Sequence, residues 1–186
     1  PITVTTNPLV TFCFFSTPSI FACQSNGILQ QDLRDKSWAR CFMGLSNKRL
    51  FITGGTGFIG SSIAERLIEN NHITVYDNFN KNLIENTPLF NHPNLTVING
   101  DVLDYDKMSD AFAGHDVDII IHLAAILGVE TVISDPVRTM ETNLMGAMNI
   151  LNIANTVGTI EHFINFSTSE VYGAYSYKLS EGDSTS

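Results

Sequence analysis

From residue 48 onward, the sequence alternates between short apolar runs and segments with a helical hydrophobic period. The apolar runs occupy residues 49–53, 72–77, 95–99, 117–123 and 162–167, and the helical patterns occupy 58–71, 105–113 and 135–157. Short continuous apolar runs are typical of strands that are buried on both faces. Because parallel strands need long crossovers, usually helical, this order predicts a parallel sheet with helices on both of its faces.

Length and charge limit the possible partners. The chain has 186 residues, of which 44% are hydrophobic and 16% charged, and its formal net charge is −9. These values are typical of one globular domain with a hydrophobic core. An acidic chain lacks the basic surface that binds nucleic acid, so we expect no nucleic-acid partner. A small phosphate-bearing ligand is not excluded, because backbone amides bind phosphate without lysines.

Residues 1–46 differ in composition from the rest of the chain. They contain all three cysteines, Cys13, Cys23 and Cys41, and the one tryptophan. The apolar stretch at 8–23 is too short and too interrupted for a membrane-spanning helix, and no basic region precedes it as in a signal peptide. The cysteines lack the spacing of metal ligands, so we expect no metal site. We leave residues 1–46 unassigned and expect them to be a poorly ordered extension. For the protein as a whole we predict a cytoplasmic location and no binding to membranes.

A cluster of glycines separates the first apolar run from the first helical pattern, in the sequence LFITGGTGFIGS at 50–61. Gly55, Gly57 and Gly60 match the spacing G-x-G-x-x-G, and Gly54 with the last two matches G-x-x-G-x-x-G. Glycines permit a tight turn and let the backbone approach a pyrophosphate, which the amides and dipole at the start of the next helix attract. The position between a strand and a helix therefore predicts a dinucleotide-binding loop.

Two aspartates after the second and third apolar runs extend this prediction. Asp77 lies 20 residues after Gly57. A carboxylate at this place accepts hydrogen bonds from ribose hydroxyls and repels a 2′-phosphate, so we predict NAD rather than NADP as cofactor. Asp101 either accepts from the exocyclic amine of the adenine or is a solvated acid at the start of a helix.

The ends of the fourth and fifth apolar runs face the same crevice in an open α/β sheet. Ala124 and Ala125 are small enough to let a flat cofactor approach, whereas we interpret His122 as a structural residue. Residues 167–173, STSEVYG, follow the fifth run. Their hydroxyls and carboxylate are either hydrogen-bond donors and a base for a substrate, or a capping turn.

Six motifs in this order resemble the extended short-chain dehydrogenase/reductase family, the NAD-dependent epimerases, dehydratases and decarboxylases of nucleotide sugars. The motifs are TGGTGFIG (53–60), VYDN (75–78), GDVLD (100–104), HLAA (122–125), DPVRTMETNLMGAMNIL (135–151) and FINFSTSEVYG (163–173). The resemblance implies an α/β fold, a Rossmann-type doubly wound parallel sheet over residues 47–186. It also implies that this sequence stops before the family's catalytic Tyr-x-x-x-Lys helix and C-terminal substrate segment.

The resemblance further implies a set of site residues. The cofactor-binding residues are Gly54, Gly57, Phe58, Ile59, Gly60, Asp77, Asn78, Asp101, Val102, Leu123, Ala124, Ala125 and Asn143. In that family the aspartate at position 101 contacts adenine, and the asparagine at 143 orients the active site. The catalytic residues are Thr168, Ser169 and Glu170, of which the threonine hydrogen-bonds the sugar hydroxyl that is oxidised.

The implied reaction begins with oxidation of the sugar at C4. STSEVYG resembles UDP-glucuronate decarboxylases, and Ser169 stands where 4,6-dehydratases carry an acid, yet HLAAILG lacks the proline-containing continuation of many decarboxylases. Both outcomes therefore stay open, as does the identity of the nucleotide sugar. Because the Tyr-x-x-x-Lys pair is absent, we expect the full-length relative to be an enzyme and this chain alone to be inactive. The alternative is a non-catalytic NAD-binding or scaffold module complete at residue 186. We expect a homodimer of the complete protein through the apolar helix at 135–157.

Overall fold

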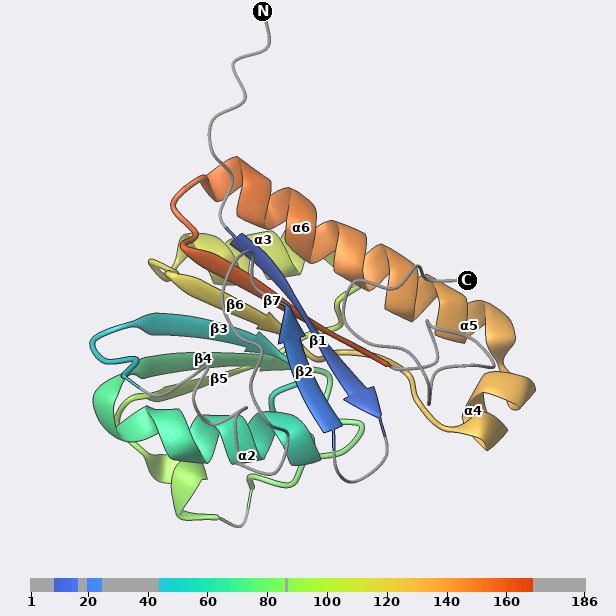
Figure 1. Ribbon diagram of the computed structural model, residues 1–186, viewed down its shortest axis with the longest axis horizontal. Coiled ribbons are helices and arrows are strands. Elements are labelled where there is room, and N and C mark those ends of the chain that lie inside the picture. Colours follow the sequence, from blue (N-terminus) through green and yellow to red (C-terminus); the bar gives the residue numbers. More distant parts are fainter. Residues whose placement is uncertain (1–8, 17–19, 25–43, 86, 169–186) are drawn as a thin grey trace, which may run out of the picture.

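The computed structural model describes residues 9–16, 20–24, 44–85 and 87–168, and its strands form one seven-stranded sheet (Figure 1). The strands are β1 (Leu9–Ser16), β2 (Ile20–Gln24), β3 (Arg49–Thr53), β4 (His72–Asp77), β5 (Leu95–Asn99), β6 (Ile119–His122) and β7 (His162–Thr168). Their order in the sheet is β2-β1-β7-β6-β3-β4-β5. Only β1 and β2 pair antiparallel, and the other neighbouring strands are parallel. The predicted parallel α/β sheet is confirmed.

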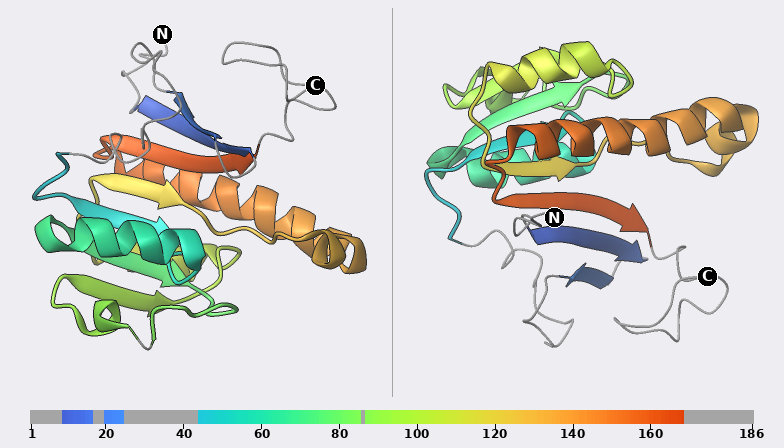
Figure 2. Two further views of the ribbon diagram at one scale, coloured as in Figure 1. Left: turned by 60° about the horizontal axis from the view of Figure 1, so that its bottom comes forward. Right: turned by 90° about the horizontal axis from the view of Figure 1, so that it is seen from above.

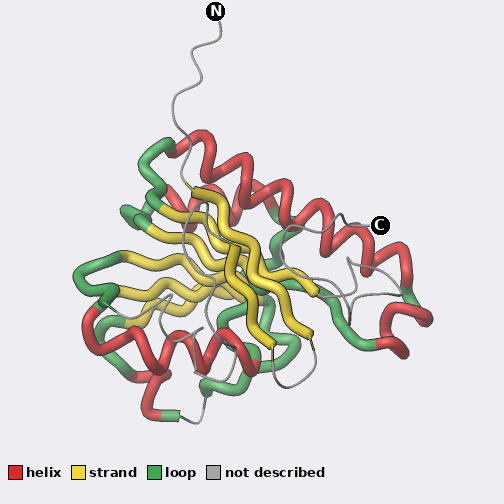
Figure 3. The backbone as a smooth tube through the Cα atoms, in the orientation of Figure 1, coloured by secondary structure: helices red, strands yellow, loops and turns green. Residues whose placement is uncertain are grey.

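Helical segments cover both faces of this sheet (Figure 3). They are α2 (Phe58–Leu67), η1 (Ile68–Asn70), η2 (Pro88–Asn91), α3 (Tyr105–Ala113), α4 (Val129–Ser134), α5 (Pro136–Met140), the π-helical η3 (Glu141–Met145) and α6 (Gly146–Val157). α2 lies on one face, and α3 and α6 lie on the other (Figure 1). The path from α4 to α5 projects beyond the carboxyl ends of β6 and β7 (Figure 2).

Strand β3 shows why the apolar runs lack alternation. Leu50 and Ile52 belong to the core beneath α2, whereas Phe51 between them belongs to the core beneath α3 and α6. All three side chains are at most 1% exposed. A strand covered on both faces is mainly apolar, because a polar side chain on either face is buried and needs a hydrogen-bond partner.

The strand order reverses direction between β3 and β6. From β3 the chain proceeds outward to β4 and β5, then returns to β6 on the other side of β3 and continues to β7. The loops after β3 and β6 consequently diverge to opposite faces at their carboxyl ends. Open α/β sheets bind ligands in the crevice at such a point.

Several boundaries differ from the sequence-based expectations. The helical pattern expected over 58–71 ends as an α-helix at Leu67 and continues as a 3₁₀ turn, and the expected strand at 117–123 is shorter. The helix expected over 135–157 contains a π-helical segment, and the short α4 precedes it. In such short segments the pattern of polar and apolar residues repeats too few times to show where an element ends or changes type.

The N-terminal segment contributes the two strands at the outer edge of the sheet. β1 pairs parallel with β7 from Leu9 to Phe15. Its sequence, LVTFCFFS, is rich in the aromatic and β-branched residues that favour strands. The unassigned extension expected over 1–46 thus includes 9–16 and 20–24 as strands, while 1–8, 17–19 and 25–43 lie outside the described residues. The domain boundary at residue 47 stays a prediction.

Candidate functional site

Most of the predicted cofactor-binding residues lie at the carboxyl ends of the parallel strands or just after them, whereas Phe58, Ile59 and Gly60 begin α2 and Asn143 lies in η3. The glycine loop follows β3, Asp77 ends β4, Asp101 follows β5, and Ala124 follows β6. Parallel strands place all of these segments at one edge of the sheet, and the loops after β3 and β6 lie next to each other because Thr53 pairs with His122. The fold therefore gathers residues that are up to 70 positions apart in sequence.

Gly54 and Gly60 are required by the packing of the loop itself. Gly54 has φ +69°, and a Cβ atom there would lie 2.7 Å from the backbone N of Ala124. A Cβ atom on Gly60 would lie 2.5 Å from the Cα of Gly55. A side chain at Gly54 would push the glycine loop away from the loop after β6, and one at Gly60 would push the start of α2 away from the glycine loop.

Gly57 has a different surrounding. Its φ of −72° and ψ of 176° suit any residue, and a Cβ atom would have only the carbonyl of Gly54 near it, at 3.4 Å. Gly57 is the N-cap of α2, yet no side chain caps this end of the helix. The helix thus begins with amides that no capping side chain satisfies and with its positive dipole end open, which suits a bound anion. At its first residues, Phe58 is 77% exposed, and Ile59 packs partly against the core.

Asp77 is buried and connects the glycine loop to the segment after β4. Its Oδ2 accepts a hydrogen bond from the backbone N–H of Thr56 at 3.0 Å, and its Oδ1 accepts one from Phe79 at 2.8 Å. A carboxylate has about four acceptor positions, so each oxygen can still accept from a ribose hydroxyl. Asn78 is exposed beside it, with its Oδ1 accepting from the N–H of Asn80.

Thr56 joins the same two segments and was not among the predicted site residues. Besides its N–H bond to Asp77, its Oγ1 donates to the carbonyl of Lys81 at 2.9 Å, and its carbonyl accepts from the N–H of Leu83 at 2.9 Å. The side chain is fully buried. The sequence offers one signal for this role: a threonine among glycines, where a hydroxyl can satisfy loop backbone.

Asp101 follows β5 and is held by several hydrogen bonds. Its Oδ1 accepts from the N–H of Leu103 at 3.0 Å, its Oδ2 accepts from Arg138 at 2.8 Å, and its carbonyl accepts from the hydroxyl of Tyr76 at 3.2 Å. Burial raises the pKa of Tyr76 to about 12, so this hydroxyl remains a donor at neutral pH. The adjacent Val102 is buried, and a Cβ atom on Gly146 would lie 2.6 Å from its Cγ2.

Thr53 holds the start of the loop after β6. Its Oγ1 accepts from the N–H groups of Leu123 and Ala124, both at 3.3 Å, and lies 2.6 Å from Nδ1 of His122. The hydroxyl and Nδ1 of the imidazole thus share one hydrogen bond. Burial lowers the pKa of His122 to about 4, so the ring is neutral at pH 7. This agrees with the interpretation of His122 as a structural residue.

Asn143 holds the same loop three residues later. Its Oδ1 accepts from the backbone N–H of Ile126 at 2.7 Å, and its Nδ2 donates to the carbonyl of Ile126 at 3.1 Å. The residue lies in the π-helical η3, and π turns are frequent at functional sites. Next to it, the hydroxyl of Thr142 is buried without a hydrogen-bond partner in the structure. Asn143 therefore positions the loop that carries Ala125, which is itself exposed.

The predicted catalytic residues lie at the end of β7. Thr168 is the last residue of that strand, and Ser169 and Glu170 lie outside the described residues. β7 runs parallel to β6, with Asn165 opposite His122. Thr168 therefore follows at the same edge of the sheet as the glycine loop, and the catalytic roles of all three residues stay predictions.

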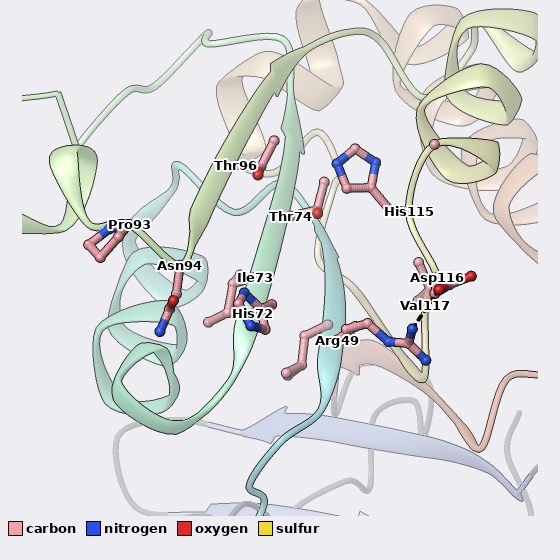
Figure 4. A pocket seen from close by; sticks show the side chains of 12 residues that line it. Arg49, His72, Ile73, Thr74, Pro93, Asn94, Thr96, His115, Asp116 and Val117 are labelled. Carbon is pink, nitrogen blue, oxygen red and sulfur yellow. Dashed lines mark hydrogen bonds and ion pairs between the residues drawn. The ribbon is translucent and has the colours of Figure 1, made fainter.

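A hollow of about 270 Å³ lies at the opposite edge, between the amino ends of β3 and β4 (Figure 4). Arg49 in its wall forms ion pairs with Asp116 at 2.7 Å and with Asp118 at 2.9 Å. The hydrogen bond from this arginine lowers the pKa of Asp118. The one arginine is already paired with two aspartates, which leaves an excess of negative charge, so the hollow does not compete with the glycine loop as a candidate phosphate site.

Two kinds of site are not found in the part of the chain that the structure describes. No three His, Cys, Asp or Glu side chains among those residues lie close enough together to hold a metal ion. Of the described helices, none has the length and apolar composition needed to cross a membrane.

Comparison with protein families and curated sequences identifies relatives of most of the chain. A family model described as GDP-mannose 4,6 dehydratase matches residues 51–184. A UDP-N-acetyl-alpha-D-glucosaminuronate decarboxylase of Bacillus cytotoxicus is 41% identical over 137 residues, which are 73% of this chain and 41% of that protein. UDP-glucuronic acid decarboxylase 1 of Danio rerio is 37% identical over 128 residues, 68% of this chain and 28% of that protein. The chain thus spans less than half the length of these relatives.

Solved structures share the same architecture. A UDP-N-acetylglucosamine 4-epimerase from Methanobrevibacter ruminantium, in complex with UDP-N-acetylmuramic acid, superposes with a TM-score of 0.68 at 32% identity, covering 76% of this chain and 45% of that one. The Bordetella bronchiseptica enzyme WbmG, in complex with NAD and UDP, superposes with a TM-score of 0.62 at 31% identity, covering 69% of this chain and 40% of that one.

Proposed function

We propose that this chain, which belongs to the extended short-chain dehydrogenase/reductase family of nucleotide-sugar epimerases and dehydratases, is the NAD-binding part of an enzyme that oxidises its sugar substrate at C4. The observation that carries the proposal is the uncapped start of α2 behind Gly57, at the point where the strand order reverses. Amides without a capping side chain, a positive dipole end and a residue without a side chain together fit a pyrophosphate.

The remaining contacts follow from the groups that converge on this point. The glycine loop from Gly54 to Gly60 holds the pyrophosphate, Asp77 accepts from the adenosine ribose, and Asp101 accepts from the adenine amine. Asp77 also excludes a 2′-phosphate by charge, which favours NAD over NADP. The Asn143 side chain and the Thr53 hydroxyl fix the loop of Leu123 to Ala125, which would contact the nicotinamide half of the cofactor.

Bound NAD supplies the oxidant that accepts a hydride from C4 of the sugar. The chain's own contribution at this step is a hydroxyl on Thr168, at the end of β7, which we propose orients the C4 hydroxyl of the substrate. Ser169 and Glu170 follow it as further substrate contacts. The sequence similarity to decarboxylases of UDP-linked uronic acids supports a decarboxylase-like outcome, and the family model supports a dehydratase-like one.

Calorimetric titration of the 186-residue chain with NAD tests the cofactor proposal. We expect saturable binding that NADP does not match, and absence of binding at millimolar NAD would refute it. The protein encoded by the complete reading frame, incubated separately with UDP-glucuronate and with dTDP-glucose, tests the reaction. Release of CO₂ indicates decarboxylation, and loss of water from the sugar of a dTDP-hexose indicates dehydration. Cofactor binding without either reaction would instead favour a non-catalytic NAD-binding module.

We also propose that the complete protein forms a homodimer through the helical path from α5 to α6. Five large apolar side chains on it are exposed, spaced three or four residues apart as along one face of a helix. They are Val137, Met140, Leu144, Met148 and Leu151. Sedimentation of Leu144→Glu and of a control, Thr156→Glu at an exposed position off this face, tests this: only the first should be monomeric. A cytoplasmic location remains part of the proposal and rests on the family resemblance.

A further inference from the structure

An ion pair joins the helix after α4 to the loop after β5. The Nη2 of Arg138 lies 2.8 Å from the Oδ2 of Asp101, although the two residues are 37 positions apart. Arg138 is itself fixed in the first turn of α5, where its backbone N–H donates to the N-cap carboxylate of Asp135. The backbone from which the guanidinium reaches the carboxylate is therefore held in place by the N-cap of α5.

The contacts of Asp101 leave room for a ligand. Its Oδ1 accepts from the N–H of Leu103 and its Oδ2 from Arg138, so each oxygen is held by one donor. A carboxylate offers about four acceptor positions, and the side chain is 30% exposed. Two acceptor positions thus remain for a donor that approaches from solvent.

We propose that Arg138 is a positioning residue for cofactor recognition: it fixes the rotamer of Asp101 so that the free acceptor positions receive the exocyclic amino group of adenine. This inference rests on the proposed binding of NAD. Ion pairs between half-exposed side chains add little to folding stability, because solvent screens them. A pair of this kind does lower the ordering cost of a ligand contact, because the carboxylate no longer has to be immobilised on binding.

The inference predicts that replacing Arg138 lowers only the part of the affinity that the adenine amino group contributes. We would measure the dissociation constants of NAD and of its analogue in which hydrogen replaces the adenine 6-amino group, using wild type, Arg138→Met and Arg138→Lys. Wild type should prefer NAD by about tenfold, as expected for a hydrogen bond to a charged acceptor. In Arg138→Met the preference should fall to about a third of the wild-type ratio or less. Arg138→Lys should retain most of the wild-type ratio.

The comparison contains its own controls. Both ligands are measured on the same preparation, so any unfolded fraction cancels from the ratio of their dissociation constants. Lys107→Met removes one positive charge from the exposed face of the neighbouring α3 and should leave the preference unchanged.

Three results would overturn the inference. An unchanged preference in Arg138→Met would show that Asp101 needs no partner. An equal loss of affinity for both ligands would assign Arg138 to another part of the dinucleotide or to the fold. Failure of wild type to bind either ligand would overturn the proposed function and this inference with it, and is recognised before any variant is made.

Discussion

Asn143 binds the backbone of Ile126 as a neighbouring strand would, with its Oδ1 accepting from the N–H at 2.7 Å and its Nδ2 donating to the carbonyl at 3.1 Å. The loop after β6 is thereby held at two places, since Thr53 binds its first two N–H groups. Both anchors come from other elements of the fold, β3 and the π-helical η3. The loop that faces the proposed nicotinamide position is thus fixed before any ligand binds.

Replacing Asn143 by alanine should loosen this loop. Ile126 then loses both partners, which we expect to lower the free energy of unfolding by about 1–3 kcal/mol. Amide hydrogen exchange should accelerate at Ile126. The control is Asn155→Ala, at an exposed position of α6, which should leave that amide unchanged. Equal exchange at Ile126 in both variants would contradict the positioning role of Asn143.

Gly57→Ala should separate ligand binding from folding. The backbone at this position suits alanine and the added Cβ has space, so the free energy of unfolding should change by less than about 1 kcal/mol. The same methyl group would occupy the proposed phosphate position, and we expect NAD affinity to fall at least about tenfold.

Two other glycines provide the comparison. Gly54→Ala should destabilise strongly, since its φ is +69° and the methyl group would meet the backbone of Ala124. Gly114→Ala, where the nearest atom lies 3.8 Å away, should preserve both stability and affinity. If Gly57→Ala unfolded as readily as Gly54→Ala, the glycine at 57 would serve the fold and not a ligand.

Stability should fall on acidification through His122. The unfolded imidazole has a pKa near 6.5, and burial lowers the folded value to about 4, so the unfolded state binds more protons between these values. The stabilisation is complete above pH 6.5 and is lost as the pH falls toward 4, amounting at most to about 3 kcal/mol.

Urea unfolding of wild type and His122→Asn between about pH 7 and pH 4.5 measures this contribution. The asparagine keeps an acceptor for the Thr53 hydroxyl but does not titrate, so its stability should decline less steeply. Parallel curves for the two proteins would show that His122 does not carry the pH dependence.

Asp77→Asn should weaken the discrimination between cofactors. The amide keeps the shape of the side chain but removes the negative charge, so repulsion of a 2′-phosphate disappears. We expect the ratio of NAD to NADP affinity to fall about tenfold or more. Asp106→Asn changes the net charge equally at an exposed position of α3 and should preserve the ratio. A ratio that fell alike in both variants would point to overall charge as the cause.

The sequence by itself determined the elements and their order. The bounds of β3, β4, β5 and α3 agree with the apolar runs and the helical pattern, because burial on one or two faces imposes a period that neighbouring residues display. The glycine spacing and the aspartate at 77 likewise predicted a dinucleotide loop, since both belong to one strand–turn–helix–strand unit.

The tertiary structure alone decided how the loops are held. Four hydrogen bonds that hold the loops join residues 17 to 71 positions apart. They run from Thr53 to the loop after β6, from Thr56 to Lys81, from Asn143 to Ile126 and from Arg138 to Asp101. Such bonds depend on the distance and direction between two backbones, which no local period encodes. They depend on the sheet, which brings the carboxyl ends of its strands together.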